Sequence, residues 1–171
     1  MKRLGSLFLA VCFLAAGCGY HFVGSGGRAP GGIKKLAIPT VENSSSYSTL
    51  TTALTNDLIH LFILSNSVNL TFPDSADAVL AVKITAVNIE GVARNRARDA
   101  SASRRVAVVV QAKLTRVGDG KIIWESRRVF GRRTYLVVED QSALEANMKT
   151  AMTEAAQEIA EKIHDNFFED Y

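Results

Sequence analysis

The chain has 171 residues, of which 47% are hydrophobic and 22% charged, enough for one domain of ordinary size with a buried core. Its three histidines, His21, His60 and His164, stand far apart and show no metal-ligand spacing with either cysteine, so the sequence predicts no metal site and no cofactor. The net charge of +3 conceals a basic stretch over residues 94–133 and an acidic stretch over residues 134–171. These two stretches either neutralise each other or leave the basic one free to bind an anion.

Residues 1–17 have the features of a bacterial secretory signal that ends at a lipidation site. A basic start precedes an apolar run over residues 4–16, which is shorter than the stretch of about 20 residues that a membrane-spanning helix needs. Small residues then lead directly to Cys18, and this arrangement resembles a lipobox. The resemblance implies cleavage before Cys18 and a diacylglycerol on its sulfur. It also implies sorting to the outer membrane, because Gly19 stands where inner-membrane lipoproteins often carry Asp. The alternative is an ordinary signal peptide in which Cys18 has no special role.

Residues 18–32 are rich in glycine and predict a flexible tether between the lipid and a single folded domain over residues 33–171. The first predicted strand covers residues 33–39 and ends at a proline. A helix is expected over residues 49–64, because leucines recur at spacings of four, four and three, and a short strand follows over residues 68–72. The predicted buried stripe of this helix consists of Leu50, Leu54, Leu58 and Leu61.

Three longer strands are predicted over residues 78–91, 104–117 and 121–136. Gly118-Asp119-Gly120 joins the last two as a hairpin turn, since glycine accepts the positive φ angles that such turns need. Alternation along the middle strand separates an apolar set, which we expect to face the helices, from a more polar outward set. The apolar set is Val106, Val108, Val110, Ala112 and Leu114, and the outward set is Ala107, Val109, Gln111, Lys113 and Thr115.

A long amphipathic helix is predicted over residues 143–168, with Ser142 and Glu145 resembling a capping box at its start. Its apolar stripe is expected to pack in the core rather than on a membrane, because its polar face is acidic. The stripe consists of Leu144, Met148, Met152, Ala155, Ile159, Ile163 and Phe167. The element order β-α-β-β-β-β-α predicts an α+β two-layer sandwich, in which two helices cover one face of a mainly antiparallel or mixed β-sheet.

Seven arginines are predicted to converge at one end of the sheet, because strand 78–91 leads to a loop at the level to which strand 121–136 returns. These candidate anion-binding residues are Arg94, Arg96, Arg98, Arg104, Arg105, Arg132 and Arg133. The planar guanidinium group grips phosphate and carboxylate oxygens with paired hydrogen bonds. A half-open sheet edge beside this rim would accept a phosphorylated glycolipid such as lipid A. The alternative is a solvated rim whose charges have scattered partners.

The start of the predicted mature chain, Cys18-Gly19-Tyr20-His21-Phe22, resembles that of the lipopolysaccharide-assembly lipoproteins of the LptE family. The lipobox, the domain size and the element order are similar as well. The resemblance implies a non-enzymatic lipoprotein anchored in the outer membrane, seated as a plug in the β-barrel of an LptD-type translocon and binding lipopolysaccharide. It also implies a role for basic residues at one end of the sheet, a regional match to Arg94, Arg96, Arg98, Arg132 and Arg133.

Other classes of function fit the sequence less well. Nucleic acid is not an expected partner, because the protein is exported and no aromatic residues are interleaved with the arginines. The sequence has no nucleophile elbow, HExxH motif or cysteine nucleophile, so we do not expect an enzyme. The alternative is a periplasmic adaptor that activates a cell-wall synthase or assists a secretion complex. A tether over residues 24–32 argues against long reach, since it averages only about 15–18 Å.

Overall fold

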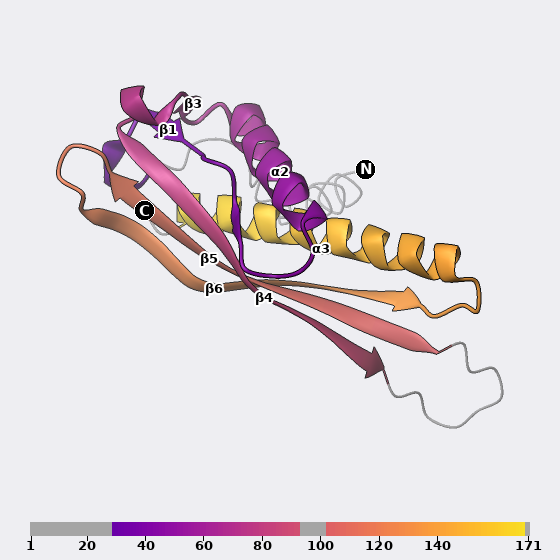
Figure 1. Cartoon of the computed structure of the whole chain (residues 1–171). Helices are drawn as coiled ribbons and strands as arrows, with labels where there is room; N and C mark the ends of the chain where they lie inside the picture. Colours follow the sequence, from indigo (N-terminus) through magenta and orange to yellow (C-terminus); the bar gives the residue numbers. More distant parts are fainter. Residues whose placement is uncertain (1–28, 93–101, 170–171) are drawn as a thin grey trace, which may run out of the picture.

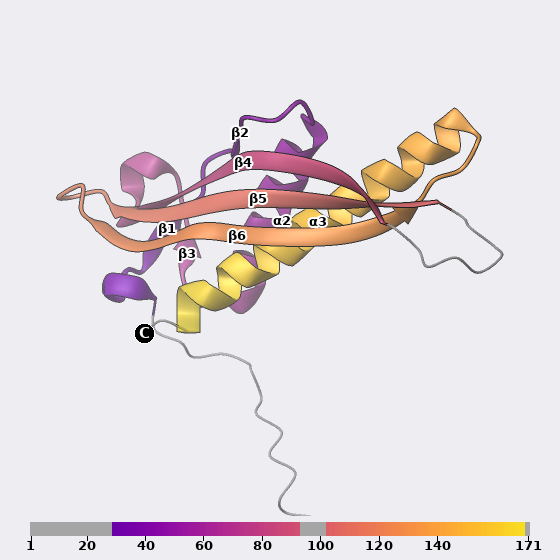
Figure 2. The same cartoon turned by 90° about the horizontal axis from the view of Figure 1, so that it is seen from below.

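The computed structural model describes residues 29–92 and 102–169, which form a six-stranded sheet with two helices on one face (Figure 1 and Figure 2). Three long strands dominate the sheet: β4 (Ala78–Val92), β5 (Ser103–Arg116) and β6 (Ile122–Leu136). They pair antiparallel as two successive hairpins. The predicted α+β two-layer architecture is confirmed, with a mixed and mostly antiparallel sheet.

Three short strands complete the sheet on the other side of β4 from β5. β1 (Lys35–Ala37) lies between the start of β4 and β3 (Asn69–Leu70), while β2 (Glu42–Asn43) pairs with the middle of β4. All three run parallel to their partners, and the strand order is β3-β1-β4-β5-β6, with β2 also against β4. β1 and β3 are shorter than predicted. The sequence predicts no strand at β2, because two residues are too few to show a periodicity.

The two helices, α2 (Thr49–Ser65) and α3 (Gln141–Glu169), pack against each other and cover the inner face of the sheet (Figure 1). In α2 three residues of the predicted stripe, Leu50, Leu54 and Leu58, are buried. The fourth, Leu61, is only half-buried, and Phe62 takes its place in the core. In α3 the predicted stripe is half-buried at its start and fully buried from Met152 onward. The buried residues of the predicted α3 stripe are Met152, Ala155, Ile159, Ile163 and Phe167.

The alternation predicted for the middle strand is confirmed. Its inner set is buried beneath the helices, whereas its outward set is half-buried or exposed. The buried set is Val106, Val108, Val110, Ala112 and Leu114. β5 is therefore the central strand of the core and fixes which face of the sheet the helices cover.

The start of α3 differs from the prediction. The Oδ1 atom of Asp140 accepts the N–H of Ala143 at 2.7 Å, so Asp140 is the N-cap and the helix begins at Gln141. The side chain of Gln141 donates to Oε1 of Glu145 at 2.8 Å. The predicted capping box of Ser142 and Glu145 is therefore wrong, because an aspartate two residues earlier occupies the capping position.

A β-bulge in β6 decides which of its later side chains face the helices. The pairing shifts between Val110 and Ala112 of β5, and Arg127 and Arg128 of β6 both lie exposed at this irregularity. One extra residue reverses the side-chain alternation of the rest of the strand. Beyond the bulge the buried residues are Val129, Gly131 and Tyr135.

Candidate functional site

The arginine-bearing end of the sheet lies where β5 begins and β6 ends. Arg105 of β5 is opposite Thr134 of β6, and Ala107 is opposite Arg132, so the pairing brings arginines of both strands to this end. The predicted site residues within the described part of the chain are Arg104, Arg105, Arg132 and Arg133. The predicted site residues outside the described part are Arg94, Arg96, Arg98 and Cys18.

The four described arginines do not form one patch, because they lie on opposite faces of the sheet. Residues directly opposite each other in an antiparallel pair share a face. Arg133 is opposite buried Val106 and Arg104 is opposite buried Tyr135, so both lie on the helix side. Arg105 and Arg132 occupy the alternate positions, on the outer face that no described helix covers (Figure 2). The single rim of arginines expected from the strand directions is divided between two faces.

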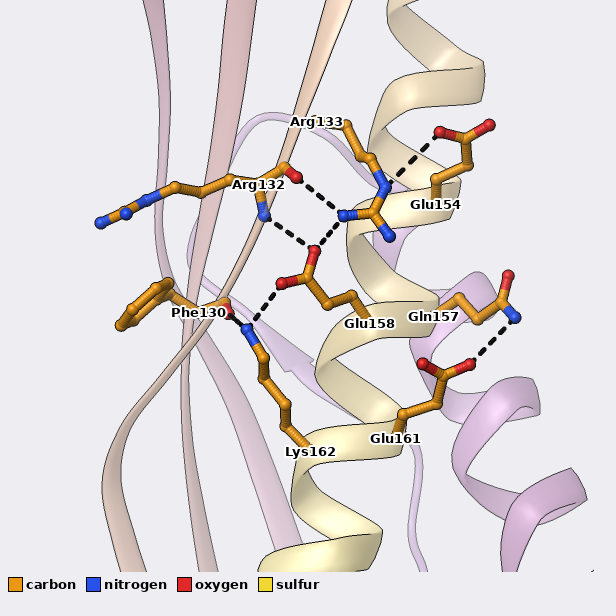
Figure 3. Close-up of polar contacts among 8 residues, drawn as sticks. All are labelled: Phe130, Arg132, Arg133, Glu154, Gln157, Glu158, Glu161 and Lys162. Atoms are coloured by element: carbon orange, nitrogen blue, oxygen red, sulfur yellow. Dashed lines mark hydrogen bonds and ion pairs between the residues drawn. The ribbon is translucent and has the colours of Figure 1, made fainter. Parts of the chain in front are cut away.

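On the helix side, Arg133 is held by two carboxylates of α3 (Figure 3). Its Nη1 atom donates a hydrogen bond to Glu158 Oε2, and its Nε atom lies 3.6 Å from Glu154 Oε2. The second oxygen of Glu158 accepts a hydrogen bond from Lys162 Nζ at 2.6 Å. The charge of Arg133 is therefore compensated within the protein, as in the alternative where the basic and acidic stretches neutralise each other.

Glu158 is the centre of this ionic cluster. Burial by itself raises the pKa of its carboxyl. The hydrogen bonds from Lys162 Nζ and from the backbone N–H of Arg132, together with the charges of Lys162 and Arg133, outweigh burial. The net effect holds the pKa of Glu158 below its ordinary value of 4.5. The carboxylate is ionised at neutral pH and joins α3 to β6.

Side chains of α3 also bind backbone groups on the free edge of β6, the last strand of the sheet. Lys162 Nζ donates to the carbonyl oxygen of Phe130 at 2.9 Å. Asn147 Nδ2 donates to the carbonyl oxygen of Leu136 at 3.2 Å. Between them, the N–H of Arg132 is bound by the ionic cluster. The sheet edge beside the arginines is therefore partly occupied at β6, because side chains of α3 bind three of its outward backbone groups.

Arg105 and Arg132 keep their charges available on the outer face. Within the described residues neither forms an ion pair, although Glu90 of β4 stands opposite Arg105 in the ladder. The guanidinium carbon of Arg132 lies 4.3 Å from the centroid of the Phe130 ring, and Lys162 Nζ lies 5.0 Å from it. Two cations therefore flank one exposed aromatic ring. Such a surface suits an anion that also has apolar parts.

The rest of the outer face is built from small and polar side chains. Ala86, Ala107 and Val109 lie in adjacent positions of β4 and β5 and are half-buried by their neighbours. Farther along β5, Gln111 and Lys113 are exposed. No described helix covers this face, because α2 and α3 both lie on the opposite side of the sheet (Figure 2).

The residues of the ionic cluster and the exposed ring that were not predicted from the sequence are Phe130, Glu154, Glu158 and Lys162. Glu158 and Lys162 are oppositely charged and four residues apart on a helix, so their spacing is a signal that could have identified the pair. Phe130 had no such signal, because its outward orientation depends on the bulge in β6.

Outside the arginine-bearing end, one carboxyl group of the described residues has a raised pKa. Burial raises the pKa of Asp57 above its ordinary value of 3.8; His60 opposes this shift and Glu161 of α3 adds to it. No group of three His, Cys, Asp or Glu side chains in the described ranges could hold a metal ion. Neither α2 nor α3 contains an apolar stretch that could cross a membrane.

Comparison with known proteins places these observations in a family. The family model LptE, described as lipopolysaccharide-assembly, matches residues 33–167. Rare lipoprotein B from Shewanella oneidensis has a similar fold, with a TM-score of 0.53 and 17% identity over 78% of this chain and 92% of that one. A minor lipoprotein from Acinetobacter baumannii gives a TM-score of 0.46 and 20% identity, again over 78% of this chain and 92% of that one. No curated protein matches the sequence.

Proposed function

The chain belongs to the LptE lipopolysaccharide-assembly family, and we propose that it is the non-enzymatic lipoprotein partner of an LptD-type outer-membrane β-barrel that delivers lipopolysaccharide. The match over residues 33–167 supports a lipopolysaccharide-assembly role for the folded part of the chain. The barrel partnership, the outer-membrane anchor and the binding of lipopolysaccharide by particular residues are further steps of the proposal.

Lipopolysaccharide binding is the step that the site geometry supports most directly. Arg105 and Arg132 form no ion pair within the described residues and share one face, and the guanidinium group of Arg132 lies over the exposed ring of Phe130. Guanidinium groups bind phosphate through paired hydrogen bonds, and an apolar ring can pack against acyl or sugar carbons. Arg133 is proposed to act indirectly, by tying β6 to α3, because carboxylates already hold it. The remaining proposed ligands are Arg94, Arg96 and Arg98, outside the described residues, and Arg104, which is exposed on the helix side at the same end of the sheet.

The outer face beyond the arginines is proposed to lie toward the barrel wall. Its small side chains, among them Ala86, Ala107 and Val109, allow close approach of another sheet or strand. Exposed Gln111 and Lys113 can hydrogen-bond to polar side chains of a barrel interior. In this arrangement the domain is held by the barrel, and lipidation at Cys18 delivers the protein to the outer membrane.

A binding measurement with purified lipopolysaccharide tests the ligand assignment. Replacing Arg105 and Arg132 by Ala in the full mature protein is expected to weaken binding about tenfold, equivalent to about 1.4 kcal/mol. The matched control replaces Arg127 and Arg128, which carry the same charge but lie at the bulge in the middle of β6. Equal affinities of the two double variants would remove Arg105 and Arg132 from the site.

Co-purification in mild detergent tests the partnership. Full-length protein extracted from outer membranes is expected to bring down a large β-barrel protein in constant ratio. Recovery of a cell-wall synthase or a secretion component in place of a barrel would favour the adaptor alternative. Recovery of the lipoprotein without a barrel would contradict the proposed partnership.

A further inference from the structure

The direction of the backbone N–H and C=O groups shows which residues of β4 and β6 face the outer edges of the three-stranded part formed by β4, β5 and β6. In an antiparallel pair, alternate residues direct both N–H and C=O toward the same neighbour. The hydrogen bonds to Phe130, Arg132 and Leu136 lie on the α3 side of β6, so these residues face away from β5. The residues between them bond to β5. Their partners on β5, Val106 and Val108, therefore face β6.

The same alternation extends from β5 to β4. Because Val106 and Val108 face β6, Ala107 and Val109 face β4, where they pair with Asn88 and Ala86. The residues between these positions on β4 therefore direct their N–H and C=O groups away from β5. They are Val87, Ile89 and Gly91, and we call their outward backbone groups the β4 edge.

The β4 edge has no partner in the described part of the chain. β1 pairs with Ala78 and Val79, and β2 pairs with Lys83 and Ile84, so both end before the β4 edge begins. Figure 2 shows the second half of β4 continuing past β2 along the margin of the sheet. No side chain of the described ranges binds these groups either. Three N–H and three C=O groups are left for another strand.

The β4 edge differs from the edge of β6 in having no side-chain partners within the described residues. Along β6, α3 side chains bind the carbonyl oxygens of Phe130 and Leu136 and the N–H of Arg132. Residues 86–92 contain no lysine or proline, the residues with which proteins commonly block an exposed edge. The inward side chains of Val87 and Ile89 are only half-buried, so an added strand would find an apolar layer to extend.

We propose that the β4 edge is a docking site for an extended segment of the barrel partner, which adds to the sheet as a further strand beside β4. Alternating N–H and C=O groups are matched fully only by an extended polypeptide, in the manner of β-strand addition. The segment would place apolar side chains beside Val87 and Ile89 and polar ones toward Asn88 and Glu90. This inference rests on the proposed partnership with a barrel.

The size of the edge favours such a partner over a second copy of this chain. Five residues at a rise of about 3.4 Å, in a sheet about 10 Å thick, bury roughly 200 Å² per partner. A stable complex buries about 800 Å² per partner. The β4 edge is therefore too small to hold a dimer alone. It suits a partner that is also held elsewhere, and its neighbours Ala86 and Asn88 continue directly into the outer face.

Gly91 offers a matched pair of variants. A Cβ atom added at Gly91 meets nothing within 4 Å, so Gly91→Ala keeps the edge N–H and fits without strain. Gly91→Pro removes that N–H and places a ring on the edge, while the ladder to β5 stays intact because this N–H faces away from it. Equal melting temperatures of the two purified variants would show that both are folded.

Co-purification of the full-length variants from outer membranes then tests the inference. Gly91→Pro is expected to recover at least tenfold less barrel than Gly91→Ala. In the unmodified complex, hydrogen exchange of the Val87, Ile89 and Gly91 amides is expected to slow at least tenfold relative to the free protein. Equal barrel recovery by both variants, or unchanged exchange in the complex, would overturn the inference and leave the proposed function standing.

Two other results of these experiments would overturn more than the role of the β4 edge alone, or would assign it to another occupant. Failure of the unmodified protein to recover any barrel would overturn the proposed partnership and this inference with it. A dimer of the purified unmodified protein that Gly91→Pro abolishes would show that a second copy occupies the edge, and would overturn the assignment to the barrel.

Discussion

At the scale of single residues, Gly131 sets how closely α3 approaches the sheet. It is buried in β6, and a Cβ atom at this position would collide with the carbonyl oxygen of Ala155 and lie 3.0 Å from Cγ1 of Ile159. The collision is with helix backbone, which cannot rotate aside as a side chain can. The absence of a side chain at Gly131 therefore allows the contact between β6 and α3 that holds the ionic cluster in place.

Replacing Gly131 by Ala is expected to destabilise the protein by about 1–3 kcal/mol, because the helix must shift away from β6. Denaturant unfolding measures this loss. The control is Gly118→Ala, since a Cβ at Gly118 meets nothing within 4 Å; its stability should stay within about 0.5 kcal/mol of the unmodified protein. Equal stabilities of the two variants would contradict the close-contact interpretation.

Glu158 makes a second prediction at the residue scale. Its pKa in the folded protein lies below the ordinary value of 4.5, so its ionisation stabilises the fold above that pH. This contribution is lost as the pH falls from about 4.5 through the lower folded-state pKa. Glu158→Gln is expected to cost about 1–2 kcal/mol at pH 7 and to flatten the loss of stability below pH 4.5.

The measurement for Glu158 is the free energy of unfolding between pH 7 and pH 3. Glu139→Gln is the control, because Glu139 is exposed and forms no ion pair within the described residues. Parallel pH profiles for Glu158→Gln and the unmodified protein would show that the ionic cluster contributes nothing to stability.

At the scale of elements, the sequence predicts the long strands and both helices well because each has a clear periodicity. Alternation in β5 and the apolar stripes of α2 and α3 correctly identify the inner layer. The arginines of β6 are harder to place. Unbroken alternation from buried Trp124 would put Arg132 on the helix side and Arg133 outside, whereas the bulge reverses both. Such a bulge arises from packing against other elements and has no local sequence signal here.

The N-terminus of α3 gives a prediction at the element scale. Asp140→Ala removes the carboxylate that accepts the Ala143 N–H and is expected to cost about 1 kcal/mol. Ser142→Ala should cost less than about 0.5 kcal/mol, since Ser142 is exposed and does not cap the helix. Thermal unfolding of the two variants measures the difference. A larger loss from Ser142→Ala would restore the capping box that the structure rejects.

At the scale of the whole molecule, the described chain begins at the end of the sheet opposite to the arginines (Figure 2). The 3-10 helix η1 (Pro30–Gly32) lies beside the hairpin end, where Gly31 is close to Arg116 and Ile123. Strands of 14 or 15 residues separate the two ends by roughly 45 Å. The predicted tether therefore joins the domain at one end of the sheet, while the proposed lipopolysaccharide site lies at the other.

The two opposite ends of the sheet have different proposed roles, one toward the lipid anchor and the other toward lipopolysaccharide. The sequence predicts the anchor and the arginines separately. The start of the described chain lies at the end of the sheet opposite to Arg105 and Arg132 because of the strand order and the packing of η1 against β6. In the proposed function, the outer face and the β4 edge hold the domain against the barrel between these two ends. The arginine-bearing end then points away from the membrane leaflet that carries the lipid.

The most direct test of the account is the arrival of newly made lipopolysaccharide at the cell surface, measured by pulse labelling in cells whose only copy of this protein is repressed. Depletion is expected to lower the labelled fraction in the outer leaflet. The unmodified protein and the Arg127→Ala/Arg128→Ala variant should restore it, while the Arg105→Ala/Arg132→Ala variant restores it only partly. Unchanged surface arrival after depletion would contradict a role for this protein in lipopolysaccharide assembly.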